Sequence, residues 1–433
     1  MALSKTPYRG TRDFFPTEMR LRNYIFKKMA EVSELFAYEP YDGPLLEEVE
    51  LYLAKSGEEL INDQIYSFTD RGDRHVAIRP EMTPTVARMV AQIHREVAKP
   101  LRWYSIPNLM RYEKPQKGRL REFWQYNADI FGAGQYGEVE IIQMAVKLIQ
   151  SFGATHEHFE VLINDRRFVD LVFTKLIGLE ENLTKKLYKL VDKKNKMDPA
   201  KFSNEVKAIT SDESKALIFE EFVSLISTGD ITKFVTKYSA DSLAEVAPLI
   251  SLFEKFTEQG LAEYVKFDPS IVRGLDYYTG VVFEIFDKHP ENRRAIAGGG
   301  SYANLLQIFN EPALEGVGIG LGEVPLKEFL HSHNLSPDFS KPELDYLVAY
   351  LVPEGEKPAM SLAQSLRESG HKVELYFGEA KPKKIFSYSE KKNFASVCFF
   401  GEEELKNDEV KVKDLKRRTE QTIKVKEFIE GKR

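Results

Sequence analysis

The sequence predicts an α+β protein in which an antiparallel sheet with flanking helices carries a helical insertion and is followed by a small α/β domain. Residues 101–131 have the pattern of two strands joined by a turn. Residues 166–263 show helical periodicity alone, and strands alternate with helices from residue 344 onward. At 433 residues the chain is too long for one ordinary core, so several domains are expected.

Two helices are expected in the first hundred residues. Between residues 21 and 36 apolar side chains recur at helical spacing, and residues 37–44 contain two prolines, an aspartate and a glycine. Those turn residues favour an extended exit from the first helix. The second helix is expected over residues 81–98, and the segment from Arg79 to Pro84 leads into it.

The expected strand over residues 120–131 has two chemically different faces when it is read with a period of two. One face is apolar except for Glu122 and carries Leu120, Trp124, Tyr126, Ala128 and Ile130. The other face is largely polar and carries Arg119, Arg121, Phe123, Gln125, Asn127 and Asp129. An extended segment over residues 101–110 precedes it, and Pro115 and Gly118 supply the turn. This pattern suits the floor of a polar cleft and a solvated hairpin equally well.

The helical stretch in the middle of the chain is interpreted as an insertion. Residues 166–263 are lysine-rich and amphipathic, and extended segments resume at residue 265 and again over 281–286. We therefore expect residues 1–165 and 264–335 to be two parts of one core, with residues 166–263 inserted between them.

The last part of the chain, residues 343–433, predicts a small and mostly parallel α/β domain. Three expected strands alternate with two expected helices, over residues 344–351, 357–368, 372–377, 382–391 and 394–399. The second of these helices mixes lysines with aromatic residues. Nucleic-acid binding would explain that mixture, but a solvated amphipathic helix is the more common explanation.

Composition excludes several classes of protein. The chain is 42% hydrophobic and 30% charged, and no run reaches the roughly 18 apolar residues that a membrane helix needs. The first residues lack the apolar core of a signal peptide, so a cytoplasmic protein is expected. The single cysteine, Cys398, lies in an apolar run and is expected in a core, and the eight histidines show no metal-ligand spacing. The net charge of −6 means that any bound nucleic acid must meet a local basic patch.

Two further segments have the residue types of an anion or nucleotide site. Arg273 stands beside Gly274 just ahead of an expected strand, an arrangement that lets a guanidinium approach phosphate oxygens. An ion pair between Arg273 and Asp276 is the structural alternative. Residues 316–322 carry glycine at every other position, so one face of the expected strand has no side chains. An adenine ring, or a packed helix, can then lie against the backbone.

With these residues in view, the chain resembles the histidyl-tRNA synthetases of the class II aminoacyl-tRNA synthetases over nearly its whole length. Residues 9–16 resemble the family's opening segment, and residues 21–44 resemble the class II dimer-interface motif. Residues 79–83 and 111–125 resemble the second class motif, and residues 272–278 resemble the signature of the histidine enzymes. The last domain resembles the family's anticodon-binding domain. The resemblance implies a class II synthetase-like sheet, a homodimer, and tRNA(His), histidine and ATP as ligands.

Residue by residue, the resemblance implies an amino-acid pocket. Glu81, Thr83 and Gln125 would hold the α-amino group of histidine. Asp129 and Tyr278 would bind its imidazole, and Tyr277 would line the same pocket.

The resemblance also implies an ATP site. Arg111 would bind the α-phosphate, Glu113 the adenine amino group and Arg121 the phosphates. Phe123 would stack on adenine, Gly322 would lie against the nucleotide, and Arg273 would neutralise charge at the α-phosphate. Arg111, Gln125 and Arg273 are thus the expected catalytic residues. Because the carboxylate of histidine is itself the nucleophile, no protein nucleophile is needed, and Mg²⁺ would arrive with ATP.

The sequence departs from the family's pattern at two places. The third class motif normally ends in a phosphate-binding arginine, and Pro325 stands at the aligned position. The glycine-rich signature normally continues Arg-Tyr-Asp, and here it continues with Ser301, Tyr302 and Ala303.

Two alternatives to a ligase follow from these departures. One is a catalytically inactive, synthetase-like regulator of the kind that binds ATP phosphoribosyltransferase. The other is a sheet-based nucleic-acid-binding protein without chemistry, which leaves the tyrosine and glycine signatures unexplained. The regulator lacks the C-terminal domain and tends to lose the second-motif arginines, whereas this chain keeps Arg111, Arg121 and Arg273.

Overall fold

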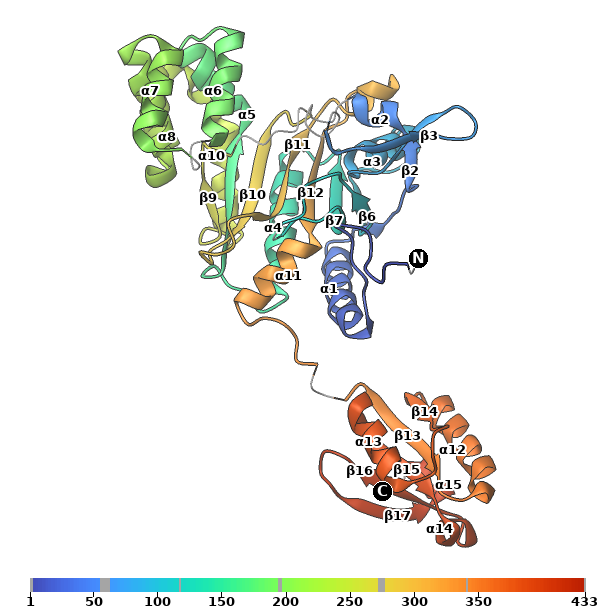
Figure 1. The fold of residues 1–433 in the computed structure, drawn as a ribbon. Helices are drawn as coiled ribbons and strands as arrows, with labels where there is room; N and C mark the ends of the chain where they lie inside the picture. Colours follow the sequence, from blue (N-terminus) through green and yellow to red (C-terminus); the bar gives the residue numbers. More distant parts are fainter. Residues whose placement is uncertain are drawn as a thin grey trace. The chain divides into compact units, whose positions relative to one another are not determined.

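The computed structural model describes residues 3–54, 63–116, 118–193, 197–271, 277–339 and 342–431. The chain forms two compact units, Met1–Ser336 and Pro337–Arg433, and each is described by itself (Figure 1). The signature residues 272–276, which include Arg273, lie outside the described residues.

A mixed sheet, almost entirely antiparallel, organises the first unit. Among the described residues the sheet has nine strands: eight follow the order β1-β5-β7-β12-β11-β10-β8-β9, and the ninth, β6, pairs with β7. Within this sheet, only β1 with β5 and β8 with β9 run parallel among the pairs of described strands. The predicted fold class is therefore confirmed. The strands are β1 (Glu39–Pro40), β5 (Leu101–Ser105), β6 (Asn108–Met110), β7 (Glu122–Phe131), β8 (Phe159–Asp165), β9 (Val265–Phe267), β10 (Val281–Asp287), β11 (Ala295–Tyr302) and β12 (Gly316–Gly322).

The two faces of the sheet differ as the period-two pattern of β7 predicts. Tyr126, Ala128 and Ile130 point into one large apolar core. Helices α1 (Pro16–Leu35), α4 (Gln135–Gln150) and α11 (Glu323–Ser332) supply the other side of that core. Helix α3 (Thr83–Ile93) packs in a separate cluster with Tyr278 and Tyr302, which lies near the polar side chains of β7. One face of the sheet is thus filled by helices, and the polar side chains of β7 occupy the other.

Two local features of this unit differ from the expectation. The extended segment over residues 101–110 is divided into β5 and β6, because Pro107 lies between them and has no N–H to donate to a ladder. A small antiparallel sheet, order β2-β4-β3, was not expected at all. Its elements are β2 (Leu46–Glu48), α2 (Val49–Leu53), β3 (Tyr66–Thr69) and β4 (His75–Ile78).

The expected helical region leaves the sheet and returns to it at the same edge. It begins directly after β8 and ends before β9, and these two strands are parallel neighbours. The region has an aromatic-rich core of its own, which includes Phe173, Phe219 and Phe222. Its helices are α5 (Arg166–Asp170), a π-helical turn (Leu171–Leu176), α6 (Glu181–Lys193), α7 (Pro199–Thr210), α8 (Glu213–Thr228), α9 (Ile231–Ser239) and α10 (Leu243–Glu258).

The second unit is an α/β domain, as predicted, with an antiparallel extension that was missed. Strands β14, β13 and β15 are parallel, and β16 and β17 continue the sheet antiparallel. Cys398 is fully buried in β15, and burial raises the pKa of its thiol. The elements are β13 (Leu344–Tyr350), α12 (Glu356–Glu368), β14 (Val373–Leu375), α13 (Pro382–Lys392), β15 (Phe394–Phe400), α14 (Glu402–Lys406), β16 (Glu409–Asp414), β17 (Glu420–Lys424) and α15 (Val425–Ile429).

Within the described ranges, no helix is both long enough and apolar enough to cross a membrane.

Candidate functional site

The floor of the candidate site is formed by two paired strands, one of which carries glycines where the other carries polar side chains. Gly318 and Gly320 of β12 lie opposite Asp129 and Asn127 of β7. A Cβ atom built on Gly318 would lie 2.1 Å from Asp129 Oδ1, and one built on Gly320 would lie 1.9 Å from Gln125 Nε2. The alternate glycines are therefore required because the polar side chains of β7 extend over the neighbouring strand. Neither an adenine ring nor a packed helix is needed to explain these two glycines.

A buried carboxyl group lies at the centre of this face. Asp129 accepts a hydrogen bond of 2.5 Å from the hydroxyl of Tyr302, at the end of β11. Burial raises the pKa of Asp129 to about 7, and the hydrogen bond from Tyr302 opposes that rise. Tyr302 was not among the expected site residues, although only Ser301 separates it from the glycine run of β11. Residue spacing could not indicate that the ring of Tyr302 lies in the pocket or that its hydroxyl contacts a carboxylate on a distant strand.

The expected amino-group ligands gather beside this carboxyl group. The hydroxyl of Tyr277 donates a hydrogen bond to Glu81 Oε2 at 3.2 Å and lies 3.4 Å from the hydroxyl oxygen of Thr83. The rings of Tyr277 and Tyr278 are 4.7 Å apart, and the ring of Tyr302 lies 6.1 Å from that of Tyr277. Segments nearly 200 residues apart in the sequence thus build one pocket of hydroxyl and carboxylate groups.

A cationic and aromatic region adjoins the pocket along β7. The guanidinium of Arg111 lies 5.5 Å from the centre of the Phe123 ring, and its Nε donates to the carbonyl oxygen of Pro80 at 2.9 Å. Arg119 forms an ion pair with Glu113, whose side chain is only 7% exposed. The expected phosphate and adenine residues Arg111, Glu113 and Phe123 are therefore brought together. Arg119 joins them, although it was not among the expected site residues.

Arg121 has a different environment from the other arginines of the hairpin. Its guanidinium lies 4.1 Å from the Tyr112 ring centre and donates to the Tyr8 hydroxyl at 2.9 Å. Its backbone N–H donates to the carbonyl oxygen of Gly10 at 2.8 Å. The N-terminal segment therefore covers Arg121 in this structure.

The end of β12 carries a carboxylate in place of a cation. Gly322 is followed by Glu323, the first residue of α11, and both of its carboxylate oxygens accept hydrogen bonds from Arg12 at 2.7 and 3.4 Å. The ring of Pro325 folds back over Gly322, where a built Cβ would lie 3.0 Å from Pro325 Cδ.

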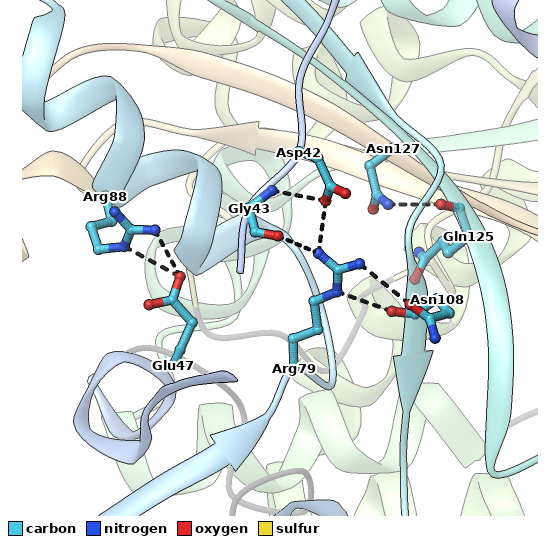
Figure 2. A network of polar contacts seen from close by, with 8 residues as sticks. All are labelled: Asp42, Gly43, Glu47, Arg79, Arg88, Asn108, Gln125 and Asn127. Carbon is cyan, nitrogen blue, oxygen red and sulfur yellow. Dashed lines mark hydrogen bonds and ion pairs between the residues drawn. The ribbon is translucent and has the colours of Figure 1, made fainter. Parts of the chain in front are cut away.

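A buried arginine connects the segments that surround the site. Arg79 Nη1 donates to Asp42 Oδ1 at 2.7 Å and to the carbonyl oxygen of Gly43 at 2.8 Å (Figure 2). Its Nε donates to the carbonyl oxygen of Asn108 at 3.0 Å. Arg79 thus fixes the start of the segment that carries Glu81 and Thr83, since it joins that segment to β6 and to the exit from α1.

Ser301 and Ala303, the two residues that depart from the glycine-rich signature, line a cavity of about 330 Å³. Ser301 Oγ donates to Glu138 Oε1 at 2.6 Å, and Ala303 and Arg167 lie on the wall of the same cavity. Burial raises the pKa of Glu138, and the hydrogen bond from Ser301 opposes the rise. Over the residues that the structure describes, no cluster of histidine, cysteine, aspartate and glutamate side chains is suited to hold a metal ion.

Comparison with known proteins decides the family. The profile of the family described as histidyl-tRNA synthetase matches residues 10–322, and that of the anticodon binding domain matches residues 345–431. The chain belongs to the histidyl-tRNA synthetase family. It is 41% identical to the histidine–tRNA ligase of Leptospira biflexa over 99% of this chain and 97% of that protein. It is 36% identical to the chloroplastic/mitochondrial histidine–tRNA ligase of Arabidopsis thaliana, over 94% of this chain and 83% of that one.

Solved structures of the synthetase family share the fold. The crystal structure of histidyl-tRNA synthetase from Nostoc sp. PCC 7120 superimposes with a TM-score of 0.82, at 20% identity, over 99% of both chains. A Bacillus halodurans protein described as an ATP phosphoribosyltransferase regulatory subunit/histidyl-tRNA synthetase gives a TM-score of 0.78 at 23% identity, over 93% of this chain and all of that one. At these identities the likeness extends to the fold alone.

The close fit of Asp129 over Gly318 leads to a prediction about stability. Gly318→Ala is expected to lower the free energy of unfolding by about 1–3 kcal/mol, because the added methyl group displaces the short, buried side chain of Asp129. Without a clash, alanine in a strand is more stable than glycine by about 0.5–1 kcal/mol. Chemical denaturation shows whether the variant is less or more stable than the wild type. Gly72→Ala is the control, since its Cβ would meet no atom closer than 3.4 Å, and a stabilised Gly318→Ala would contradict the account.

The buried Asp129 leads to a prediction about pH. Its pKa is raised to about 7, so the native protein retains a proton that the unfolded chain has released above pH 4. Stability is therefore lost as the pH rises from 4 towards 7, by at most about 4 kcal/mol relative to Asp129→Asn. Denaturation of both proteins at pH 5 and pH 8 measures the difference.

A partly exposed carboxylate, Asp70, has the opposite dependence of stability on pH, so Asp70→Asn serves as a control for Asp129→Asn. Hydrogen bonds from the Arg74 backbone and side chain lower the pKa of Asp70, so its contribution to stability is lost as the pH falls. A pH-independent difference between wild type and Asp129→Asn would mean that Asp129 is not buried in a neutral form.

Proposed function

We infer that this protein is a histidine–tRNA ligase, which activates histidine with ATP and transfers it to tRNA(His). One observation carries the inference. A single chain joins the synthetase region, matched over residues 10–322, to an anticodon-binding domain, matched over residues 345–431. A regulator without the second domain does not account for residues 337–433, and a nucleic-acid-binding protein without chemistry does not account for the buried pocket around Asp129.

The pocket around Asp129 is proposed to bind histidine. Glu81, Thr83 and the amide oxygen of Gln125 are acceptors that suit an ammonium group. Asp129 and Tyr278 would bind the two ring nitrogens of the imidazole, and Tyr302 would fix the orientation of Asp129 through its 2.5 Å hydrogen bond. A buried site that satisfies both nitrogens rejects amino acids without them, because its own polar groups would then be left unpaired.

The region around Arg111 and Phe123 is proposed to bind ATP. Phe123 would stack on adenine, Glu113 would accept from its amino group, and Arg111 would bind the α-phosphate. Gly322 would leave room for the nucleotide, while Arg121 and Arg273 would add positive charge near the phosphates. Glu113 pairs with Arg119 in this structure, so adenine would share that carboxylate with Arg119. Mg²⁺ would enter with ATP, bound to its phosphates.

The reaction needs positioning and charge neutralisation more than it needs proton transfer. A carboxylate oxygen of histidine forms a bond to the α-phosphorus, and the bond from that phosphorus to the bridging oxygen breaks as pyrophosphate leaves. A hydroxyl of the terminal ribose of tRNA then attacks the histidyl carbonyl carbon, and AMP leaves. The nucleophile of the first step is already ionised, so the arginines have the main task, which is to stabilise the charge on phosphorus.

The protein is also proposed to act as a homodimer in the cytoplasm. The buried side chains of α1, Ile25, Met29 and Val32, pack in the core of their own subunit. Leu46 of β2, Leu53 of α2 and Phe68 of β3 are 44–49% exposed, and these apolar side chains suit contact with a second copy of the chain.

Exchange of labelled pyrophosphate into ATP, with histidine and without tRNA, tests the proposal. Histidine-dependent exchange is expected for the wild type. Arg273→Ala is expected to reduce it by about 10²–10³-fold, because a donor that stabilises developing charge contributes about 3–4 kcal/mol. Absence of exchange by the wild type at high enzyme concentration would remove the ligase assignment and favour a regulatory protein. Unimpaired exchange by Arg273→Ala would make Arg273 a structural residue.

A further inference from the structure

Arg294 stands out among the cations near the proposed ATP site. It is the last residue before β11, its side chain is half-buried, and it makes no hydrogen bond or ion pair with any of the described residues. Its neighbour Arg293 is exposed. A partly buried guanidinium without a partner is unfavourable, because it has lost hydration and has gained no hydrogen bonds in return.

The surroundings of Arg294 are those of the proposed ATP site. A Cβ built on Gly118, in the turn of the hairpin, would lie 3.3 Å from Arg294 Cδ. Burial, followed by the positive charge of Arg119, lowers the pKa of Arg294, and the carboxylate of Glu113 opposes this effect. Glu113 is already paired with Arg119. Two guanidinium groups therefore face one carboxylate, and one positive charge is left uncompensated.

The other arginines of this region have partners. Arg111 donates to the carbonyl oxygen of Pro80, Arg121 to the hydroxyl of Tyr8, and Arg12 to the carboxylate of Glu323. The end of β12 adds a negative charge, Glu323, and no cation. Among these arginines, all within the described part of the chain, Arg294 is the one whose guanidinium has no hydrogen-bond acceptor.

We propose that Arg294, together with Arg119, binds the terminal phosphates of ATP and the pyrophosphate that leaves. This inference rests on the proposed function, because it requires ATP on this face of the sheet. A planar guanidinium binds two phosphate oxygens at once and retains its charge at every accessible pH. When the bond between the α-phosphorus and the bridging oxygen breaks, the electron pair passes to pyrophosphate, and Arg294 neutralises the charge that develops there. No proton is transferred in this step.

The structural alternative is that Arg294 only supports the turn at Gly118. The two roles differ in what they predict for nucleotides of different length. A terminal-phosphate ligand affects ATP and leaves AMP unaffected, whereas a support for the turn affects both, because both share the adenine site.

Calorimetric titration of Arg294→Gln with ATP and with AMP, in the presence of Mg²⁺, tests the proposal. The affinity for ATP is expected to fall by about 10- to 100-fold, the range for one hydrogen bond to a charged group. The affinity for AMP and the KM for histidine are expected to stay within about twofold. Arg294→Lys is expected to recover part of the ATP affinity, because it restores the charge without the planar fork. Arg293→Gln is the matched control and is expected to behave as wild type.

Three outcomes would overturn the assignment of Arg294. They are an unchanged ATP affinity, an equal loss of ATP and AMP affinity, and a loss for Arg293→Gln as large as that for Arg294→Gln. A wild type without histidine-dependent exchange would be a failure of the proposed function, and it would be seen before any variant is made.

A measurement on the wild type keeps the proposal testable if the variants do not fold. Pyrophosphate, and ATP more than AMP, is expected to protect Arg294 from an arginine-specific dicarbonyl reagent, as followed by peptide mass spectrometry. Arg293 is expected to react equally in all conditions. Modification of Arg294 at the same rate with and without pyrophosphate would overturn the proposal.

Discussion

The candidate site depends on the clearance between β7 and β12. Asp129 and Gln125 extend from one strand across the backbone of the next, and they do so only because Gly318 and Gly320 carry no Cβ at the points of contact. The sheet thereby holds polar side chains flat on one face while the same strand fixes Tyr126, Ala128 and Ile130 in the apolar core on the other. A polar pocket is built in this way on two paired strands inside the sheet, where its geometry is set by strand register.

The charged side chains around β7 and β12 fall into two groups, those paired within the protein and those left incompletely paired. Arg79 and Arg12 form ion pairs with the carboxylates of Asp42 and Glu323, and they join the segments that enclose the site. Asp129 is buried with a single hydroxyl donor, and Arg294 is partly buried with no partner among the described residues. Groups that are buried and incompletely satisfied are costly to stability, so they are expected where a ligand completes their interactions. The imidazole of histidine and the phosphates of ATP have the chemistry to do so.

Much of the fold followed from the sequence because local patterns agreed with the final packing. The period-two alternation of residues 120–131 distinguished the apolar face of β7, which packs against helices, from its polar face correctly, and the helical insertion and the last α/β domain followed from periodicity. The small sheet of β2, β3 and β4 was missed because its strands have three or four residues each, which is too short for a period to be recognised. The β16–β17 hairpin was missed because alternating strands and helices suggested parallel pairing throughout the domain.

The site was less predictable than the fold, since its contacts join distant segments. The alternation places Arg119 and Arg121 on one face with Phe123, but β7 begins only at Glu122, and the two arginines diverge before it. Tyr302 and Arg294 each act on residues more than 150 positions away, which no local spacing could indicate. The residue types at Arg273 and Gly274 indicated an anion site, and the resemblance to the family supplied the proposed role of Arg273 at the α-phosphate.

The most direct test of the account is the dissociation constant of histidine for Gly318→Ala, compared with that of ATP for the same variant. The added Cβ would lie 2.1 Å from Asp129 Oδ1, so the carboxyl group must move away from the imidazole position. The account predicts that histidine binds at least about tenfold more weakly, the lower limit for a lost hydrogen bond to a charged group, while ATP binding is retained. Histidine affinity equal to that of the wild type would show that the bare floor of β12 does not position Asp129 for its ligand.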